Sequence, residues 1–141
     1  MDIELTNNPE PADLKVVTEG MRAYELSVFP NLPDESEDLT VAAFVRDRGG
    51  VVCGGIKANI YWDGVEIDVL WIADGMRRQG LASKLMRAIE DAAKAKGAVV
   101  SFLKTFNARI FYESLGYTVF GVLEDRPIGT KLYYMKKRLD T

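Results

Sequence analysis

The first apolar stripe of the chain lies in residues 12–29. Its apolar positions, Leu14, Val17, Met21, Tyr24 and Val28, are about 3.5 residues apart, which predicts a helix with one apolar face. Pro11 suits the first turn of that helix, because an amide at this position has no intrahelical partner to lose.

The pattern then changes to segments typical of strands. We expect strands over residues 39–47, 51–62 and 65–73. Gly49-Gly50 and Asp63-Gly64 lie between them and favour tight hairpin turns, so the three strands form an antiparallel meander. The Gly54-Gly55 pair inside the second strand predicts a bulge.

The second half of the chain returns to helical spacing from Gln79 to Lys96, and Gly97 is a suitable residue to end that helix. The remaining expected elements are a strand at 98–104, a short helix at 107–115, and strands at 117–124 and 130–138. The order is therefore one helix followed by β-β-β-α-β-α-β-β. It predicts an α/β (α+β) fold with a single mixed, mostly antiparallel sheet flanked by helices.

The size and composition fit one globular domain over residues 1–141. A chain of 141 residues buries about 68% of its unfolded surface, which is enough for a stable core without disulfide bonds or metal ions. The net charge of −3 argues against a partner that is nucleic acid or an anionic membrane. No stretch approaches 18 apolar residues and the first residues are acidic, so we expect neither a membrane span nor a secretory signal. The single Cys53 allows no intrachain disulfide, and we expect a cytoplasmic location.

Histidine is absent from the chain. This excludes the usual zinc sites and every Ser-His-Asp or Cys-His arrangement, and we expect no metal. An enzyme with this sequence has to work with carboxylates, tyrosine, serine, lysine or backbone groups.

The charges are distributed unevenly. Residues 1–70 hold 5 Lys and Arg against 14 Asp and Glu, a net charge of −9, whereas residues 71–141 hold 13 against 7, a net charge of +6. One interpretation is ordinary solvated faces. The other is an acidic half that attracts a cationic acceptor and a basic half that attracts an anionic ligand.

The segment from Leu70 to Leu85 has the clearest pattern of a ligand-binding site. A strand runs into a turn with Arg77 and Arg78, then into a helix that begins after Gly80. Unbonded amides at a helix start, together with cationic side chains and small residues, suit a diphosphate. The alternative is a plain helix start with surface arginines. The sequence contains neither the Gly-Lys-Ser/Thr of ATPase loops nor a G-x-G-x-x-G after a strand.

Two motifs resemble one known family. Arg77-Arg78-Gln79-Gly80-Leu81-Ala82 is similar to the Q/R-x-x-G-x-G/A signature of the GNAT superfamily of acetyl-CoA-dependent N-acetyltransferases. The stretch from Asn107 to Tyr117 resembles the closing Phe-Tyr-x-x-x-Gly-Phe/Tyr segment of that family. The resemblance extends from about residue 39 to the end of the chain. Ala82 replaces the second glycine of the signature, within the range of the family.

The resemblance implies an acyl-CoA N-acyltransferase-like fold in which the sheet splays between residues 65–73 and 98–104. It implies direct transfer of an acetyl group from acetyl-CoA to a primary amine of a small molecule or peptide, with no covalent enzyme intermediate. Tyr112 would be the general acid for the departing thiolate. The residues implied to contact CoA are Leu70, Trp71, Ile72, Arg77, Arg78, Gln79, Gly80, Leu81, Ala82, Ser83 and Asn107.

Two carboxylates are our candidates for the general base. Glu66 and Asp68 lie two residues apart on one strand and so share a face, directly before the expected phosphate turn. The alternative is that both are surface carboxylates of a hairpin. Tyr112 also has an alternative role, as an aromatic residue packed beneath the short helix, and we expect either Phe111 or Tyr112 to belong to the core.

Two other functions compete with the acetyltransferase. One is a noncatalytic CoA-binding or sensor module on the same fold. The other is an unrelated phosphate-binding α/β domain, which the paired motifs disfavour. We further expect exposed sheet edges, which favour a homodimer. The identity of the amine and the length of the acyl chain stay open at this point.

Overall fold

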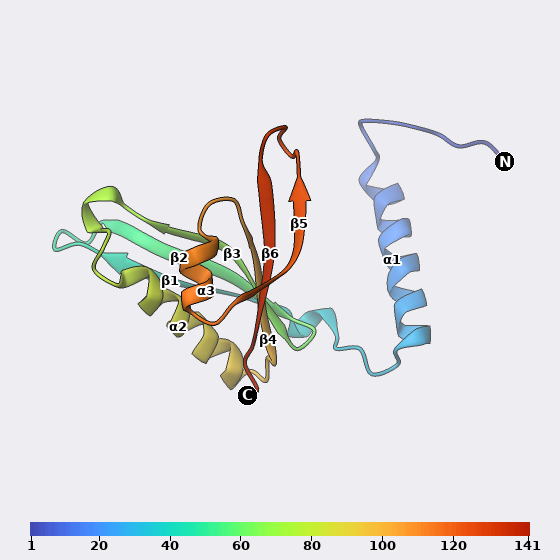
Figure 1. The fold of residues 1–141 in the computed structure, drawn as a ribbon. Helices are drawn as coiled ribbons and strands as arrows, with labels where there is room; N and C mark the ends of the chain where they lie inside the picture. The colour runs from blue at the N-terminus through green and yellow to red at the C-terminus, as the bar shows by residue number, and fades with distance from the viewer. The chain divides into compact units, whose positions relative to one another are not determined.

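A computed structural model describes all 141 residues, which form two compact units, Met1–Asp34 and Glu35–Thr141 (Figure 1). The first unit holds helix α1 (Pro11–Val28). The second holds the strands β1 (Leu39–Arg46), β2 (Val52–Tyr61), β3 (Gly64–Ile72), β4 (Val100–Thr105), β5 (Thr118–Glu124) and β6 (Lys131–Arg138), and the helices α2 (Leu81–Ala95) and α3 (Arg109–Ser114). The predicted order of elements is confirmed.

Helix α1 begins as the sequence predicts. Pro11 lies in its first turn, and no side chain caps that end. The Arg22 guanidinium donates a hydrogen bond of 2.9 Å to the carbonyl of Pro33, which ties the helix to the segment that follows it in the same unit. No helix of the chain is both long and apolar enough to cross a membrane.

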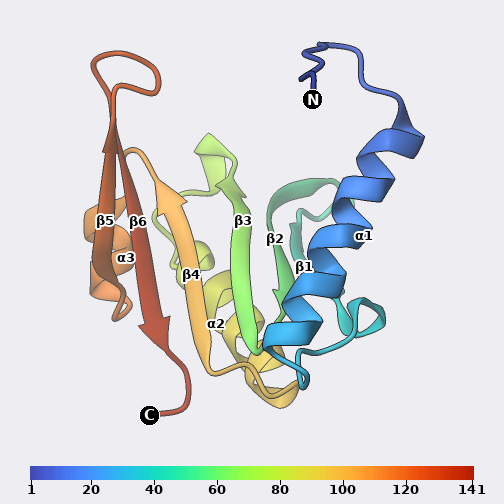
Figure 2. The ribbon, with the colours of Figure 1, turned by 90° about the vertical axis from the view of Figure 1, so that its right-hand side faces the viewer.

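The second unit is built on one six-stranded sheet in the order β1-β2-β3-β4-β6-β5, which Figure 2 shows from edge to edge. Every neighbouring pair is antiparallel except β3 and β4, which are parallel. The predicted fold class, a mixed and mostly antiparallel sheet with helices, is therefore confirmed.

Two irregularities bend the first three strands. In β2, Gly54 pairs with Val45 and Val52 with Arg46, so the extra residue is Cys53, one position before the predicted Gly54-Gly55 bulge. In β3, Lys57 pairs with Val69 and Ala58 with Ile67, which leaves Asp68 as an extra residue. This second bulge changes the direction of β3 just before the strand ends.

The shorter elements of the second half end differently from the prediction. Helix α3 covers Arg109–Ser114 rather than 107–115, because the Ala108 amide bonds to the Thr105 hydroxyl at 3.1 Å and keeps the preceding residues in a turn. Strand β4 starts at Val100 rather than at residue 98. The Ala98 amide still bonds to the Ala93 carbonyl at 3.0 Å, so this residue completes the end of α2.

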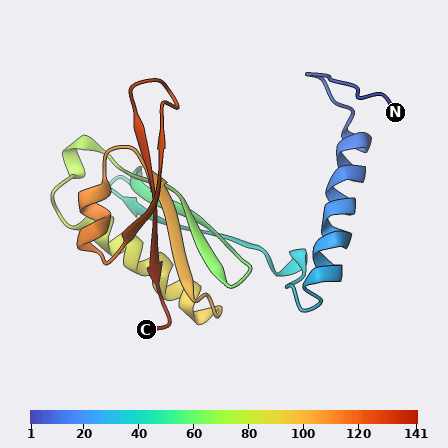
Figure 3. The ribbon, with the colours of Figure 1, turned by 45° about the vertical axis from the view of Figure 1, so that its right-hand side comes forward.

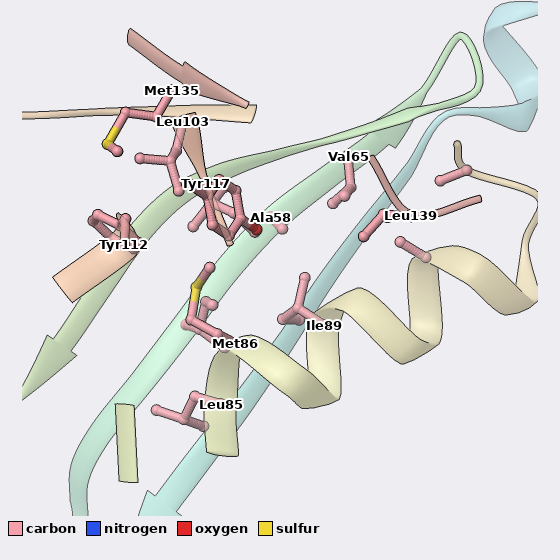
Figure 4. Packing of buried hydrophobic residues seen from close by; sticks show 14 of the residues in the cluster. Ala58, Val65, Leu85, Met86, Ile89, Leu103, Tyr112, Tyr117, Met135 and Leu139 are labelled. Carbon is pink, nitrogen blue, oxygen red and sulfur yellow. The ribbon is translucent and has the colours of Figure 1, made fainter. Parts of the chain in front are cut away.

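The core lies between the sheet and the helices α2 and α3, which cover the same face (Figures 1 and 3). Helix α2 contributes Leu85, Met86, Ile89 and Ala93, all of which are buried. Fully burying one such large side chain contributes about 1.5–3 kcal/mol, so the apolar stripe of α2 is a main source of stability. Figure 4 shows Leu85, Met86 and Ile89 on the side of α2 that faces the sheet.

Tyr117 is the largest fully buried side chain of the core. Its hydroxyl donates to Glu90 Oε2 at 2.8 Å and lies 2.7 Å from the Ser101 hydroxyl. Burial is the main cause that raises the pKa of the Tyr117 phenol. The hydrogen bond from Ser101 lowers the pKa by less than burial raises it, and the negative charge of Glu90 raises it further. The folded chain therefore keeps this phenol neutral at alkaline pH.

We predict that Tyr117 makes the fold sensitive to alkali. The phenol binds its proton more tightly in the folded state, so its contribution to stability is complete below the unfolded pKa of about 10 and declines as the pH rises above it. The loss is about 1.4 kcal/mol for each pH unit above 10. Thermal unfolding between pH 8 and 11 should show a smaller alkaline decline for Tyr117→Phe than for the natural chain. The exposed Tyr24→Phe should behave like the natural chain, and equal declines in all three proteins would refute the prediction.

Candidate active site

The sheet divides between β3 and β4. These parallel strands pair only over Gly64–Glu66 and Val100–Phe102, although β3 continues to Ile72 and β4 to Thr105. Beyond this point β3 stays bonded to β2, and β4 to β6. The predicted splay of the sheet is therefore confirmed, and the facing edges of the two strands have no strand partner.

A cleft of about 480 Å³ opens at the end of β3. Its walls come from the end of β3, the following turn, the first turn of α2 and the start of α3. They comprise Leu70, Trp71, Ile72, Met76, Arg77, Arg78, Gly80, Leu81, Ala82, Ser83, Ala108 and Phe111. Most of the residues expected to contact CoA therefore line one cavity. Gln79 and Asn107 do not line it. Both are exposed, and their chain neighbours Gly80 and Ala108 form the wall instead.

The start of α2 leaves amide groups without partners beside this cleft. Gly80 is the N-cap, with a left-handed φ of 73°, and no side chain caps the helix. The Lys84 amide is the one that bonds to the Gly80 carbonyl, at 3.1 Å. The amides of Leu81, Ala82 and Ser83 precede it and lack an intrahelical acceptor, so the helix presents positive partial charge here.

The two arginines of the turn differ in their contacts. Arg77 Nε donates to the Ile72 carbonyl at 3.0 Å, and its Nη1 lies 3.1 Å from Asp74 Oδ1. Arg78 has a left-handed φ of 65° and forms no bond within the chain. Arg77 therefore secures the turn to the end of β3, whereas the guanidinium of Arg78 is available to an anion in the cleft.

The two candidate bases lie in different surroundings. Glu66 is the last residue of β3 that pairs with β4, where it lies opposite Phe102, so it sits at the point where the strands part. Asp68 is the bulged residue, and its Oδ2 lies 3.0 Å from Lys57 Nζ in a half-exposed ion pair. Burial raises the pKa of the Tyr61 phenol, and the nearby Glu66 carboxylate raises it further. Glu66 thus has a phenol beside it, while a lysine neutralises Asp68.

The ring of Tyr112 belongs to the core, with only 8% of the residue exposed. It packs edge-on against Phe111 at 5.1 Å and against Tyr117 at 5.9 Å between ring centroids. No fully buried polar side-chain atom of the chain lacks a hydrogen-bond partner. The Tyr112 hydroxyl forms no bond within the chain, so it reaches the surface. Burial raises the pKa of this phenol, so it is protonated at neutral pH and is a weaker acid than an exposed tyrosine.

Comparison with known proteins identifies the fold and the enzyme class. Residues 9–117 match the model of the Acetyltransferase (GNAT) family. The chain belongs to the GNAT family. It is 26% identical over 140 residues to acetyltransferase Atu2258 of Agrobacterium fabrum (strain C58 / ATCC 33970), covering 98% of this chain and 99% of the relative. It is 30% identical over 101 residues to blasticidin-S acetyltransferase of Streptomyces morookaense, covering 70% and 74%.

A solved structure agrees over nearly the full length. The 1.9 Å crystal structure of an acetyltransferase from Bacillus cereus ATCC 14579 superposes with a TM-score of 0.83 at 29% identity, covering 96% of this chain and 97% of that one. The predicted membership of the GNAT superfamily and the enzyme class, an acetyltransferase, are both confirmed. Acetyl-CoA is the donor general to the GNAT family.

Three residues that line the cleft of this GNAT enzyme were not among those expected to contact CoA: Met76, Ala108 and Phe111. Ala108 and Phe111 lie inside the Asn107–Tyr117 motif, so the motif indicated the right segment. It implied roles for the adjacent residues Asn107 and Tyr112 instead. Met76 belongs to a short 3₁₀ turn, Asp74–Met76, that no local pattern indicated. Of Phe111 and Tyr112, the ring of Tyr112 is the one buried in the core, whereas Phe111 is partly buried, packs against the core and also lines the cleft.

Proposed function

We propose that this GNAT acetyltransferase moves the acetyl group of acetyl-CoA directly to a primary amine of a small molecule or peptide. The observation that carries the proposal is the early end of β3–β4 pairing at Glu66, followed by an open cleft at the start of α2. A carboxylate, an unpartnered strand edge and a helix N-terminus then follow one another along the same gap. In this order, the carboxylate suits an amine, the strand edge suits the amides of pantetheine, and the helix N-terminus suits a diphosphate.

In this proposal the donor lies along the gap. The amides of Leu81, Ala82 and Ser83 and the guanidinium of Arg78 hold the diphosphate. The free edge of β3 at Leu70–Ile72 hydrogen-bonds the pantetheine amides in the manner of an added strand. The exposed Asn107, next to the cleft residue Ala108, contacts the pantetheine arm.

We assign the reaction to Glu66, at the point where β3 and β4 part, and to Tyr112 of α3. A lysine-like amine with a pKa of about 10.4 is neutral in only about 1 molecule in 2,500 at pH 7, so Glu66 accepts its proton, directly or through water. Once Glu66 has passed that proton to water, the neutral nitrogen forms the C–N bond, the C–S bond breaks with its electron pair left on the sulfur, and the nitrogen gives its surplus proton to Glu66. Tyr112 donates a hydrogen bond or its proton to that thiolate. Full transfer from an ordinary phenol, with a pKa of about 10, to a thiol near 8.5 costs roughly 2 kcal/mol, and the raised pKa of Tyr112 increases this cost, so stabilisation of the sulfur charge is the larger part of its role.

A cationic acceptor fits the charge distribution. Glu66 is partly buried at the inner end of the gap. The negative charge of Asp38 acts on the same Tyr61 phenol as Glu66 does, so two carboxylates lie near one phenol. The relative from Streptomyces morookaense is a blasticidin-S acetyltransferase. We therefore place small amines with additional positive charge first among the acceptors, ahead of neutral amines.

The proposal is tested by thiol release from acetyl-CoA over a panel of amines. We expect turnover with at least one cationic amine, and with Tyr112→Phe we expect kcat to fall about 100-fold while acetyl-CoA still raises the melting temperature. Tyr24→Phe, on the first helix, is the matched control and should keep full activity. A chain that binds acetyl-CoA but acetylates no amine would refute amine transfer.

The two arginines should separate binding from folding. Arg78→Ala should weaken acetyl-CoA about tenfold, roughly 1.4 kcal/mol, with little change in the melting temperature of the free protein, since Arg78 has no partner to lose. Arg77→Ala should lower that melting temperature as well, because it removes the bond to the Ile72 carbonyl. Titration calorimetry and thermal unfolding measure the two effects, with Arg48→Ala as a control in the β1–β2 turn. Unchanged affinity in Arg78→Ala would place the diphosphate elsewhere.

The two carboxylates should also separate. We expect Glu66→Gln to lower kcat/KM about 100-fold at pH 7, with the difference shrinking at higher pH as the free amine becomes abundant. Asp68→Asn should change the rate less than threefold, because it removes only an exposed ion pair with Lys57. Rates from pH 6.5 to 9.5 test both variants. A larger loss in Asp68→Asn than in Glu66→Gln would reverse the assignment.

A further inference from the structure

The end of α3 links Tyr112 to Tyr117 through the backbone. The Tyr117 amide donates to the Tyr112 carbonyl at 3.1 Å, and the Gly116 amide donates to the Glu113 carbonyl at 3.0 Å. Gly116 has a left-handed φ of 96°. This pair of bonds is the Schellman arrangement, in which the residue after the glycine commonly packs on the last turn of the helix. Here that contact is the edge-on packing of the Tyr117 ring against the Tyr112 ring, which Figure 4 shows beside Leu103 and Met86.

Tyr117 is itself held by a chain of hydrogen bonds. Lys137 Nζ lies 2.7 Å from Glu90 Oε1, and Glu90 Oε2 accepts from the Tyr117 hydroxyl at 2.8 Å. The phenol has one proton and uses it in the hydrogen bond to Glu90, so in the contact of 2.7 Å the Ser101 hydroxyl donates to the phenol oxygen. The order of donation is therefore Ser101 to Tyr117 to Glu90, with Lys137 donating from the other side. These residues belong to β4, the segment after α3, α2 and β6.

This chain of bonds is shielded from water. Ser101 is 0% and Tyr117 1% exposed, and the side chains of Glu90 and Lys137 are 12% and 27% exposed. Hydrogen bonds that involve charged groups in such surroundings are strong and directional, unlike those of an exposed pair such as Lys15–Glu19. The Lys137 ammonium also lies 5.6 Å from the centre of the Tyr117 ring. The ring of Tyr117 is thus fixed by its hydroxyl, by its face and by its backbone amide.

We propose that Tyr117 is a positioning residue for the acetyl-transfer reaction. The bonds from Ser101, Glu90 and Lys137 fix its ring, and that ring packs against the ring of Tyr112 and so limits where the Tyr112 phenol can lie. The Tyr112 hydroxyl has no bond of its own within the chain, so its location depends on the packing of its ring and on the backbone of α3. The inference rests on the proposed function, in which Tyr112 acts on the leaving thiolate.

The test compares single and double variants. Tyr117→Phe keeps the ring and the amide bond and removes only the hydroxyl. We expect its kcat to fall about 3- to 30-fold while its KM for acetyl-CoA changes less than twofold. Because Tyr117 acts through the phenol of Tyr112, the double variant Tyr112→Phe/Tyr117→Phe should be no slower than Tyr112→Phe alone. Glu90→Gln retains a carbonyl acceptor for the phenol, so it should lose less activity than Glu90→Ala.

Each outcome has a defined meaning. All rates are taken at a temperature at which circular dichroism shows every variant folded, with Ile89→Val as a control for a core change on the same helix outside the bonded chain. Rates in Tyr117→Phe that match the natural chain overturn the inference, and so does a double variant slowed by the product of the two single effects. If kcat falls in Tyr112→Phe but not in Tyr117→Phe, the inference on Tyr117 is overturned while the proposed role of Tyr112 stands. Full activity in Tyr112→Phe overturns the proposed role of Tyr112 as well.

Discussion

The candidate active site depends on the point at which β3 and β4 stop bonding to each other. Their parallel pairing covers three residue pairs and ends at Glu66 and Phe102. Beyond it each strand follows its other neighbour, and the bulge at Asp68 turns β3 further. An unbroken sheet would have consumed the backbone donors and acceptors of both strands. The split leaves one edge of β3 available to an extended ligand inside a well-packed unit.

Helix α2 serves both the core and the cleft. Its buried face, with Met86 and Ile89, anchors it to β1, β2 and β3, so its first turn is held rigidly at the open end of the gap. Gly80 leads into that turn in a left-handed conformation that other residues adopt only with strain. The packing of the core therefore fixes where the positive end of the helix lies, and Arg77 secures the same turn to the end of β3.

Local patterns in the sequence predicted much of this arrangement. The apolar spacing located α1 and α2, the turn residues located the β1–β3 meander, and the two motifs named most of the cleft. What they missed depends on contacts between distant segments. The bulge at Asp68 arises from the register between β2 and β3. It places Asp68 in an ion pair with Lys57, while Glu66 lies where β3 and β4 separate. The difference between Arg77 and Arg78, and the chain of bonds behind Tyr117, likewise required the assembled fold.

The most direct measurement is a crystal structure of the protein with CoA bound. The split of the sheet predicts the diphosphate on the amides of Leu81–Ser83, the pantetheine along the free edge of β3, and the sulfur within hydrogen-bond distance of the Tyr112 hydroxyl. A coenzyme bound outside the gap, or strands β3 and β4 paired through to Ile72 and Thr105, would contradict it.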